Sequence, residues 1–113
     1  MQNDLQITFR NMDSSEALAA NVRDKAAKLE EFFDNVISCR VVVEARHHHH
    51  HKGNLYHALV DISVPGREIV ISRDPDEHHS HEDVYVAVRD AFDAAYRQLE
   101  DHARKVRGEV KRH

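Results

Sequence analysis

The stretch from Ser80 to Val106 constrains the fold more than any other part of this sequence. Its apolar residues recur at three- and four-residue steps, which places them on one side of an α-helix. A helix of this length cannot bury such a stripe by itself, so a flat apolar surface has to lie beneath it. The stripe consists of Val84, Val88, Ala91, Ala95, Leu99 and Val106.

Both ends of this helix carry recognisable signals. Ser80 and Asp83 have the spacing of a capping box, which predicts the start of the helix. Gly108 predicts its end, because glycine commonly follows the last helical turn. The cations just before Gly108 suit the negative end of a helix dipole.

The beginning of the chain predicts a strand followed by a helix. Residues 5–10 alternate between apolar and polar side chains, the pattern of a half-buried strand. Asp13 and Glu16 again have capping-box spacing, so we expect a helix from there to Phe33, ending near Asp34 and Asn35. Its apolar stripe consists of Leu18, Val22, Ala26, Leu29 and Phe33.

Three more strands are predicted, over Ile37–Arg46, Leu55–Val64 and Arg67–Arg73. The last two are joined by a Pro65-Gly66 turn signal, and short turns predict antiparallel pairing. The first strand reaches the sheet through a helix, so it should pair in parallel with a later strand through a right-handed crossover.

The predicted fold class is α+β, a two-layer sandwich in the order strand, helix, three strands, helix. One face of its four-stranded mixed sheet is apolar and the other is mixed, so both helices belong on the same face. A ferredoxin-like fold would need a strand where this chain has its final helix. A length of 113 residues fits a single domain over 1–113, with a flexible tail expected from about residue 108.

The motifs that accompany catalysis do not occur in this sequence. It has no nucleophile elbow, no glycine-rich phosphate loop and no Cys-x-x-Cys pair, and Cys39 is its single cysteine. No apolar run reaches the ~20 residues of a membrane helix, and no signal peptide opens the chain. We therefore expect a cytoplasmic protein without catalytic residues, cofactor, membrane partner or small-molecule substrate.

Eleven histidines make the chain histidine-rich. His47–His51 occupy a predicted hairpin turn, and His78, His79 and His81 precede the long helix. Imidazoles are common metal ligands, but a defined site needs partners that orient each ring, and no spacing here implies them. We expect no specific metal site and keep metal binding as an alternative. Protonation of all eleven would change the formal net charge from −4 to +7, so pH is a variable for charged partners.

Basic residues offer another candidate site. Lys25 and Lys28 lie beside the apolar stripe of the first helix, so the two helices together are predicted to present a basic strip along their seam. The alternative is ordinary ion pairing along each helix, for example between Arg97 and Asp93 or Asp101. On the second helix the strip would consist of Arg97, Arg104, Lys105 and Arg107.

Three segments give the chain a family resemblance. LQITFRNMDSSEAL, KAAKLEEFF and EDVYVAVRDAFDAAYRQLE, in this order of elements, resemble the short ribosome hibernation-promoting factors. These are also called ribosome-associated translation inhibitors or sigma-54 modulation proteins. The resemblance implies a fold similar to double-stranded RNA-binding domains. It also implies binding to the small ribosomal subunit, in the channel of messenger and transfer RNA, and inhibition of translation in stressed cells.

The resemblance assigns rRNA contacts to Lys25, Lys28, Arg97 and Lys105, with Arg89, Arg104 and Arg107 as compensating cations. Relatives carry lysines where this chain has Ala94, Asp101 and Ala103. The chain ends soon after the second helix, without the dimerisation domain of the long family form, so we expect a monomer. Two alternatives stay open: a histidine-rich metal-binding protein on this scaffold, and a divergent member that binds a protein through its acidic first helix.

Overall fold

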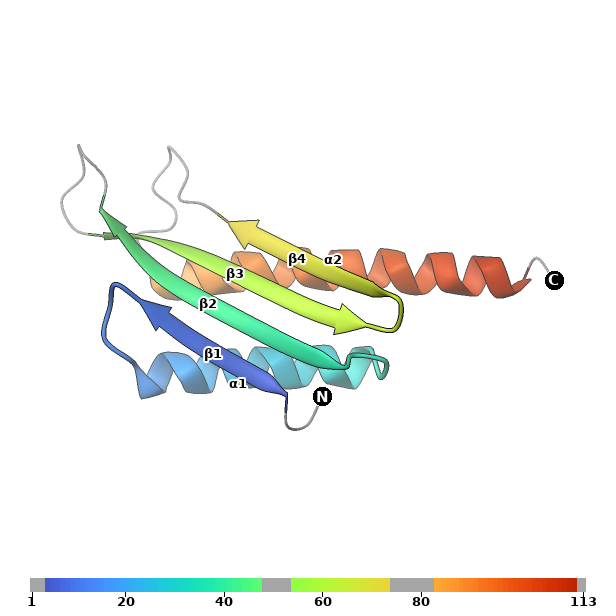
Figure 1. Cartoon of the computed structure of the whole chain (residues 1–113), viewed down its shortest axis with the longest axis horizontal. Helices are drawn as coiled ribbons and strands as arrows, with labels where there is room; N and C mark the ends of the chain where they lie inside the picture. Colours follow the sequence, from blue (N-terminus) through green and yellow to red (C-terminus); the bar gives the residue numbers. More distant parts are fainter. Residues whose placement is uncertain (1–3, 48–53, 74–82, 112–113) are drawn as a thin grey trace.

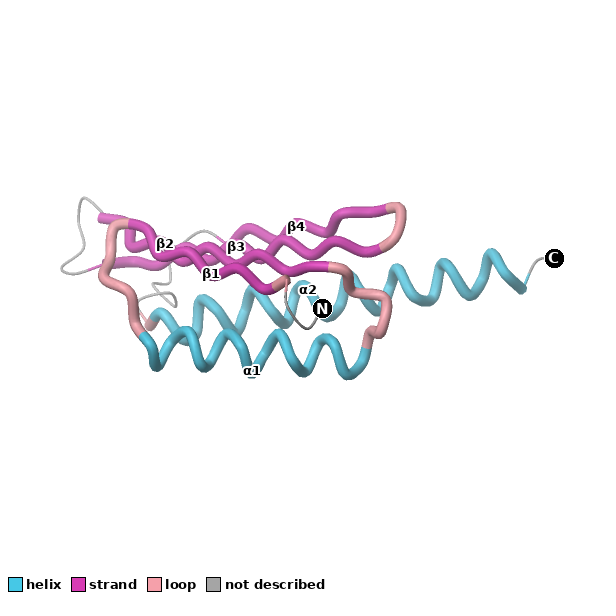
Figure 2. The backbone as a smooth tube through the Cα atoms, turned by 60° about the horizontal axis from the view of Figure 1, so that its bottom comes forward, coloured by secondary structure: helices cyan, strands magenta, loops and turns pink. Residues whose placement is uncertain are grey.

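The sheet and the two helices form two layers. The computed structural model describes residues 4–47, 54–73 and 83–111. The strands lie in the order β1-β2-β3-β4, with β1 parallel to β2 and the other neighbours antiparallel. Both helices cover one face of the sheet (Figures 1 and 2), so the predicted α+β sandwich is confirmed. The elements are β1 (Leu5–Arg10), α1 (Glu16–Phe32), β2 (Ser38–His47), β3 (Asn54–Val64), β4 (Arg67–Arg73) and α2 (Val84–Lys111).

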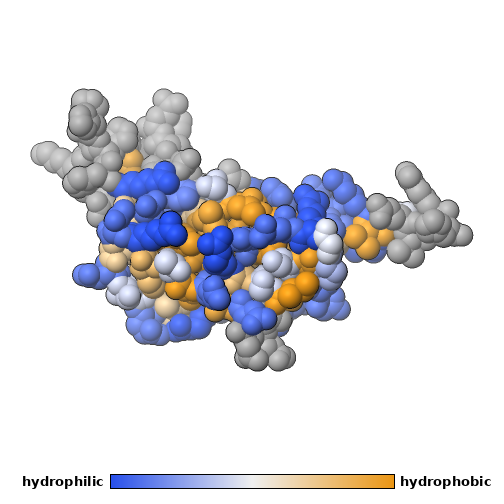
Figure 3. All heavy atoms as spheres, in the orientation of Figure 1, coloured by the Kyte–Doolittle hydropathy of each residue, from blue (hydrophilic) through white to orange (hydrophobic). Residues whose placement is uncertain are grey.

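The alternation of side chains sets the register of the sheet. Val41 of β2 lies opposite Ile7 of β1 on one side and Val60 of β3 on the other, and Val60 lies opposite Ile71 of β4. This row faces the helices and belongs to the core. The next row along the strands points to the opposite, open face, where apolar and hydrophilic residues are mixed (Figure 3).

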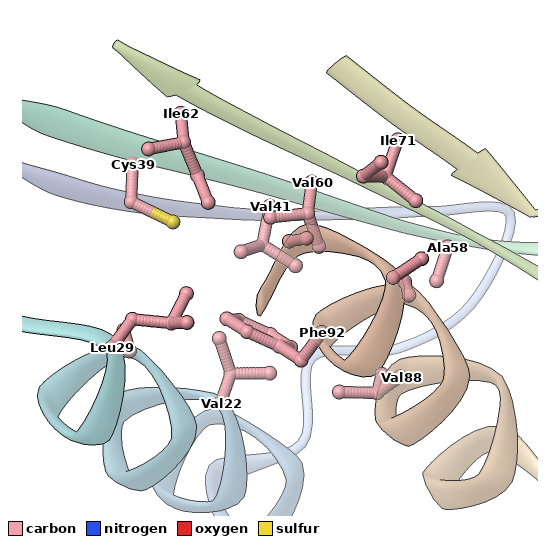
Figure 4. Close-up of a cluster of buried hydrophobic side chains, with 14 of the residues drawn as sticks. Val22, Leu29, Cys39, Val41, Ala58, Val60, Ile62, Ile71, Val88 and Phe92 are labelled. Atoms are coloured by element: carbon pink, nitrogen blue, oxygen red, sulfur yellow. The ribbon is translucent and has the colours of Figure 1, made fainter. Parts of the chain in front are cut away.

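Phe92 of α2 is a central residue of the core. Its ring lies between Val22 and Leu29 of α1 and the strands above them, and Val88 lies beside it (Figure 4). The predicted apolar stripe of the long helix omitted Phe92, as well as the buried Ala87 and Ala94. The side of α2 that is buried is therefore wider than the stripe, because it contacts both the sheet and α1.

The predicted start of the first helix requires correction, and that of the second is described only in part. The first helix is capped by Ser15, whose Oγ accepts a hydrogen bond from the amide of Leu18 at 3.1 Å, and not by Asp13. Ser15 directly precedes the first helical residue, whereas Asp13 lies too far upstream to reach that turn. At α2, a carboxylate oxygen of Asp83 accepts from the amide of Tyr85 at 2.8 Å, so Asp83 itself caps this end. The predicted cap at Ser80 lies outside the described residues.

The C-terminal end of α2 extends past the sheet. The helix continues through Gly108 to Lys111, so the predicted stop at Gly108 is wrong. Leu99 is the last fully buried residue of α2, and Val106, predicted to belong to the buried stripe, is 43% exposed because no strand lies beneath it (Figure 1). We call residues 100–111 the overhang. It helps to explain a radius of gyration of 15.4 Å, where about 13 Å is typical of this length.

Replacement of Leu99 by alanine should cost about 2–5 kcal/mol of unfolding free energy, because Leu99 is 1% exposed and its truncation leaves a cavity in the core. Val106→Ala is the matched control on the same helix and should change the unfolding free energy by less than about 0.5 kcal/mol. Urea denaturation of both variants measures the difference. Equal losses would mean that α2 lies in another register.

Gly108→Ala should stabilise the protein, because Gly108 is helical and an added Cβ meets no atom within 4 Å. The gain should be a few tenths of a kcal/mol and at most ~1 kcal/mol, since alanine is the better helix former and the site is near the end. Circular dichroism through a thermal transition would detect it. A loss of helix content in this variant would show that Gly108 ends the helix after all.

Candidate nucleic-acid interface

A groove runs along the seam where α1 and α2 lie side by side. The two helices run in the same direction under the sheet (Figure 2), so the C-terminal half of α1 lies against the middle of α2. The groove has a volume of about 280 Å³. Its lining combines apolar, aromatic and charged side chains from both helices: Lys25, Lys28, Leu29, Phe32, Phe92, Asp93 and Tyr96.

Aromatic rings form one end of this groove. The ring centroids of Phe32 and Tyr96 are 5.7 Å apart, with their planes at 83°. The ring centroid of Phe33, the residue after α1, lies 5.2 Å from that of Tyr96. Edge-to-face pairs of this kind are the favoured aromatic geometry. Phe92 and Leu29 are buried at the groove's base, whereas Phe32 is 66% exposed. No local sequence pattern indicates the cluster, because its rings come from two segments far apart in the chain.

The two lysines of α1 lie on the groove as predicted. Lys25 and Lys28 follow each other by three residues, which puts both on the flank of α1 that faces α2. Lys28 approaches the carboxylate of Asp24 at 3.5 Å, and both side chains of that pair are largely exposed. Such a pair is weak, at about 0–1 kcal/mol. Lys25 forms no ion pair with a residue that the structure describes. Both ammonium groups can therefore be turned toward an anion.

The basic residues of α2 do not all lie on this side. Asp93 is the exposed residue of α2 that lines the groove. At about 100° per residue, Arg89 and Arg97 each lie about 40° from Asp93, so both are on the groove flank. Lys105 lies about 120° from Asp93 and projects away from the groove. The single strip predicted along the seam is therefore divided. One part consists of the groove with Arg89 and Arg97, and the other of the overhang with Arg104, Lys105 and Arg107.

Carboxylates accompany several of these cations. The guanidinium of Arg89 lies 3.1 Å from Asp90, and Arg104 pairs with Asp101. Arg97 forms no ion pair within the described part of the chain, so the predicted pairing with Asp93 or Asp101 is not formed. Ala94, one of the positions where the family resemblance leads us to expect a lysine, is buried and belongs to the core of this chain.

A second hollow, of about 330 Å³, lies on the open side of the sheet and is polar and acidic. Arg40 lies 3.2 Å from Asp61 there, and a hydrogen bond with Asp61 raises the pKa of Glu68 above its ordinary value. In the described strands this face presents no Phe, Tyr or Trp side chain on which an unpaired base could stack.

The remaining reactive side chains are buried or lie outside the described residues. Burial, with a contribution from the charge of Asp61, raises the pKa of the Cys39 thiol to about 12, so the thiol stays protonated. His57, predicted to point away from the core, is buried on the open side of the sheet, with its Nε2 2.7 Å from Ser72 Oγ. No group of three or more His, Cys, Asp or Glu in the described ranges is placed to hold a metal.

The histidine segments at 48–51 and 78–81 are not among the described residues. Neither described helix combines the length and apolar character that crossing a bilayer requires.

Comparisons with known proteins identify relatives of this chain in sequence and in fold. Residues 5–107 match the family model described as Sigma 54 modulation protein / S30EA ribosomal protein. The ribosome hibernation promoting factor of Escherichia coli K12 is 32% identical over 103 residues, covering 91% of this chain and 96% of that relative. The factor of the same name from Shigella flexneri gives the same figures.

Two solved structures share the fold. A ribosomal subunit interface protein from Coxiella burnetii superposes with a TM-score of 0.72 at 16% identity, over 88% of this chain and 97% of that one. The N-terminal domain of Protein Y from Thermus thermophilus gives 0.68 at 19% identity, over 88% and 98%. The family match spans nearly all of the described elements, and the E. coli relative is matched over almost its whole length. This chain therefore belongs to the Sigma 54 modulation protein / S30EA ribosomal protein family.

Proposed function

We propose that this protein binds the rRNA of the small ribosomal subunit and inhibits translation, which promotes ribosome hibernation under stress. The family membership and the 32% identity to a factor named for ribosome hibernation support this function. The observation that carries it on this chain is the placement of Lys25 and Lys28 together on an exposed groove between the helices. In this proposal the protein acts in the cytoplasm as a monomer.

The proposed inhibition is steric and needs no chemical step. A protein that occupies the channel of messenger and transfer RNA excludes both as long as it stays bound. Its affinity would come chiefly from lysine and arginine side chains that replace the counterions of rRNA phosphates. These contacts also fix the orientation of the protein, without reading the sequence of bases. We assign them to Lys25, Lys28, Arg89, Arg97, Arg104, Lys105 and Arg107.

Part of the formal net charge of −4 lies away from the groove. The acidic hollow with Asp61 and Glu68 is on the open side of the sheet, whereas the groove is on the helix side. Exposed charges more than ~8–10 Å apart are largely screened at physiological salt, so these two carboxylates oppose an RNA on the helix side only weakly. Asp24 and Asp93 do lie beside the two lysines.

Reversal of both groove lysines, Lys25→Glu with Lys28→Glu, should weaken co-sedimentation with purified small subunits. A plot of the logarithm of the binding constant against the logarithm of salt concentration should also become less steep. Its slope should change by about 1.4–1.8, the amount expected for the loss of two phosphate contacts. Arg10→Glu with Arg67→Glu makes the same charge change at exposed sites outside the groove. This control should lose much less affinity. An identical loss in both double variants would make the effect one of net charge alone.

Within the overhang, the side of the helix that carries a cation should decide how much its reversal weakens binding. Arg107→Glu reverses a charge on the side that continues the groove flank, and Lys105→Glu reverses one on the opposite side. We expect the first substitution to weaken subunit binding more than the second. Filter binding at several salt concentrations measures both. The opposite ranking would move the RNA to the far flank of α2 and away from the groove.

A further inference from the structure

We infer that the groove between α1 and α2 holds one unpaired nucleotide of the bound RNA, and that it prefers guanine. The base would stack at Phe32 and Tyr96, its hydrogen-bonding edge would meet Asp93, and its phosphate would lie at Lys25 and Lys28. This inference rests on the proposed function and gives one part of that surface a base-reading role, beyond the phosphate contacts that position the protein.

The aromatic end of the groove is suited to a base. Phe32 keeps 66% of its surface exposed although it directly contacts Tyr96, so the pair leaves apolar ring surface open to a ligand. Unpaired RNA bases are commonly held by stacking on phenylalanine and tyrosine rings. Because Phe33 and the buried Phe92 support Tyr96 and the base of the groove, the rings are held in place before any ligand arrives.

The groove has room for one base. Its volume of about 280 Å³ accommodates a single base that is splayed out of its strand. The rest of the strand would continue past the two lysines on the rim.

The charges around the groove distinguish its two sides. Lys25 and Lys28 come from α1, and Asp93 comes from α2. The lysines can neutralise a phosphate, but a carboxylate would repel one. Asp93 forms no ion pair with a described residue, so its oxygens remain available as acceptors. An ionised carboxylate accepts hydrogen bonds only, and the ligand group facing Asp93 therefore has to donate.

This requirement selects among the bases. Guanine presents two adjacent donors on its Watson–Crick edge, the N1–H and the exocyclic amine, which match the two oxygens of a carboxylate. Uracil presents one N–H flanked by two carbonyl oxygens, and those would face Asp93 unfavourably. Adenine and cytosine each place an acceptor nitrogen beside their amine. Bases unstacked from single-stranded RNA are read on these edges, which gives guanine the best fit.

The test uses the whole chain and five-nucleotide RNAs that differ only at the central position. An oligouridylate with one central guanosine should bind about tenfold more tightly than the all-uridine strand, the discrimination expected of a good bidentate contact. Inosine, which keeps the N1–H and lacks the exocyclic amine, should fall between them. Fluorescence anisotropy at low salt measures all three. Equal affinities, or no binding by any strand, would overturn the inference.

Two substitutions assign the preference to its residues. Asp93→Ala should abolish discrimination between guanosine and uridine without lowering affinity for uridine, because it removes a negative charge. Phe32→Leu keeps an apolar side chain and should weaken the guanosine strand at least fivefold by loss of stacking. Both side chains are exposed, so urea denaturation should show an unchanged fold. A guanosine preference that survives Asp93→Ala would contradict the inference.

Sedimentation with small subunits separates this inference from the proposed function. If the wild-type chain binds subunits but shows no base preference, only the base-reading role fails. If it binds neither subunits nor oligonucleotides, both fail. An acidic peptide that displaces RNA and depends equally on Phe32 would identify the groove as a protein-docking site and overturn the base-reading role.

Discussion

The packing of the two layers depends on Phe92 of α2, which contacts both α1 and the sheet. A sheet that is apolar on one face has to be covered across its whole width, and a single helix is too narrow to do so. Phe92 fills the space between the helices, with Val22 and Leu29 on one side and the sheet above (Figure 4). Its position fixes the separation of α1 and α2, and with it the width of the groove that Lys25 and Lys28 line. Stability and the candidate interface thus share one side chain.

The regular parts of the fold could be predicted from sequence because their side chains alternate with a clear period. The row of Val41, Val60 and Ile71 follows from period-two patterns, and the parallel pairing of β1 with a later strand follows from the helix after it; only the structure identifies that strand as β2. The ends of the helices were less predictable. Asp13 and Ser15 both resemble caps, and only the path of the chain decides between them. Gly108 is tolerated inside a helix that nothing beneath it forces to stop.

The candidate site was predicted only in part, for a similar reason. Periodicity placed Lys25 and Lys28 beside the buried stripe of one helix, and the structure places them there. Periodicity could not place Lys105, which projects away from the groove, because the flank of α2 that meets α1 depends on how two distant elements pack. The aromatic contact between Phe32 and Tyr96 joins residues far apart in the chain, and no local pattern encodes it. Surfaces made by two elements are where local sequence reasoning is weakest.

The two parts of α2, the buried part and the overhang, tolerate different substitutions. Residues up to Leu99 are held by the core, so substitutions there are limited by folding. From Glu100 to Gly108 no side chain is buried, and exchanges among helix-forming residues there change little except charge. Natural selection can therefore adjust the overhang for its partner without endangering the domain. Among relatives, we expect the composition of this segment to diverge with the partner while the length of the buried part stays constant.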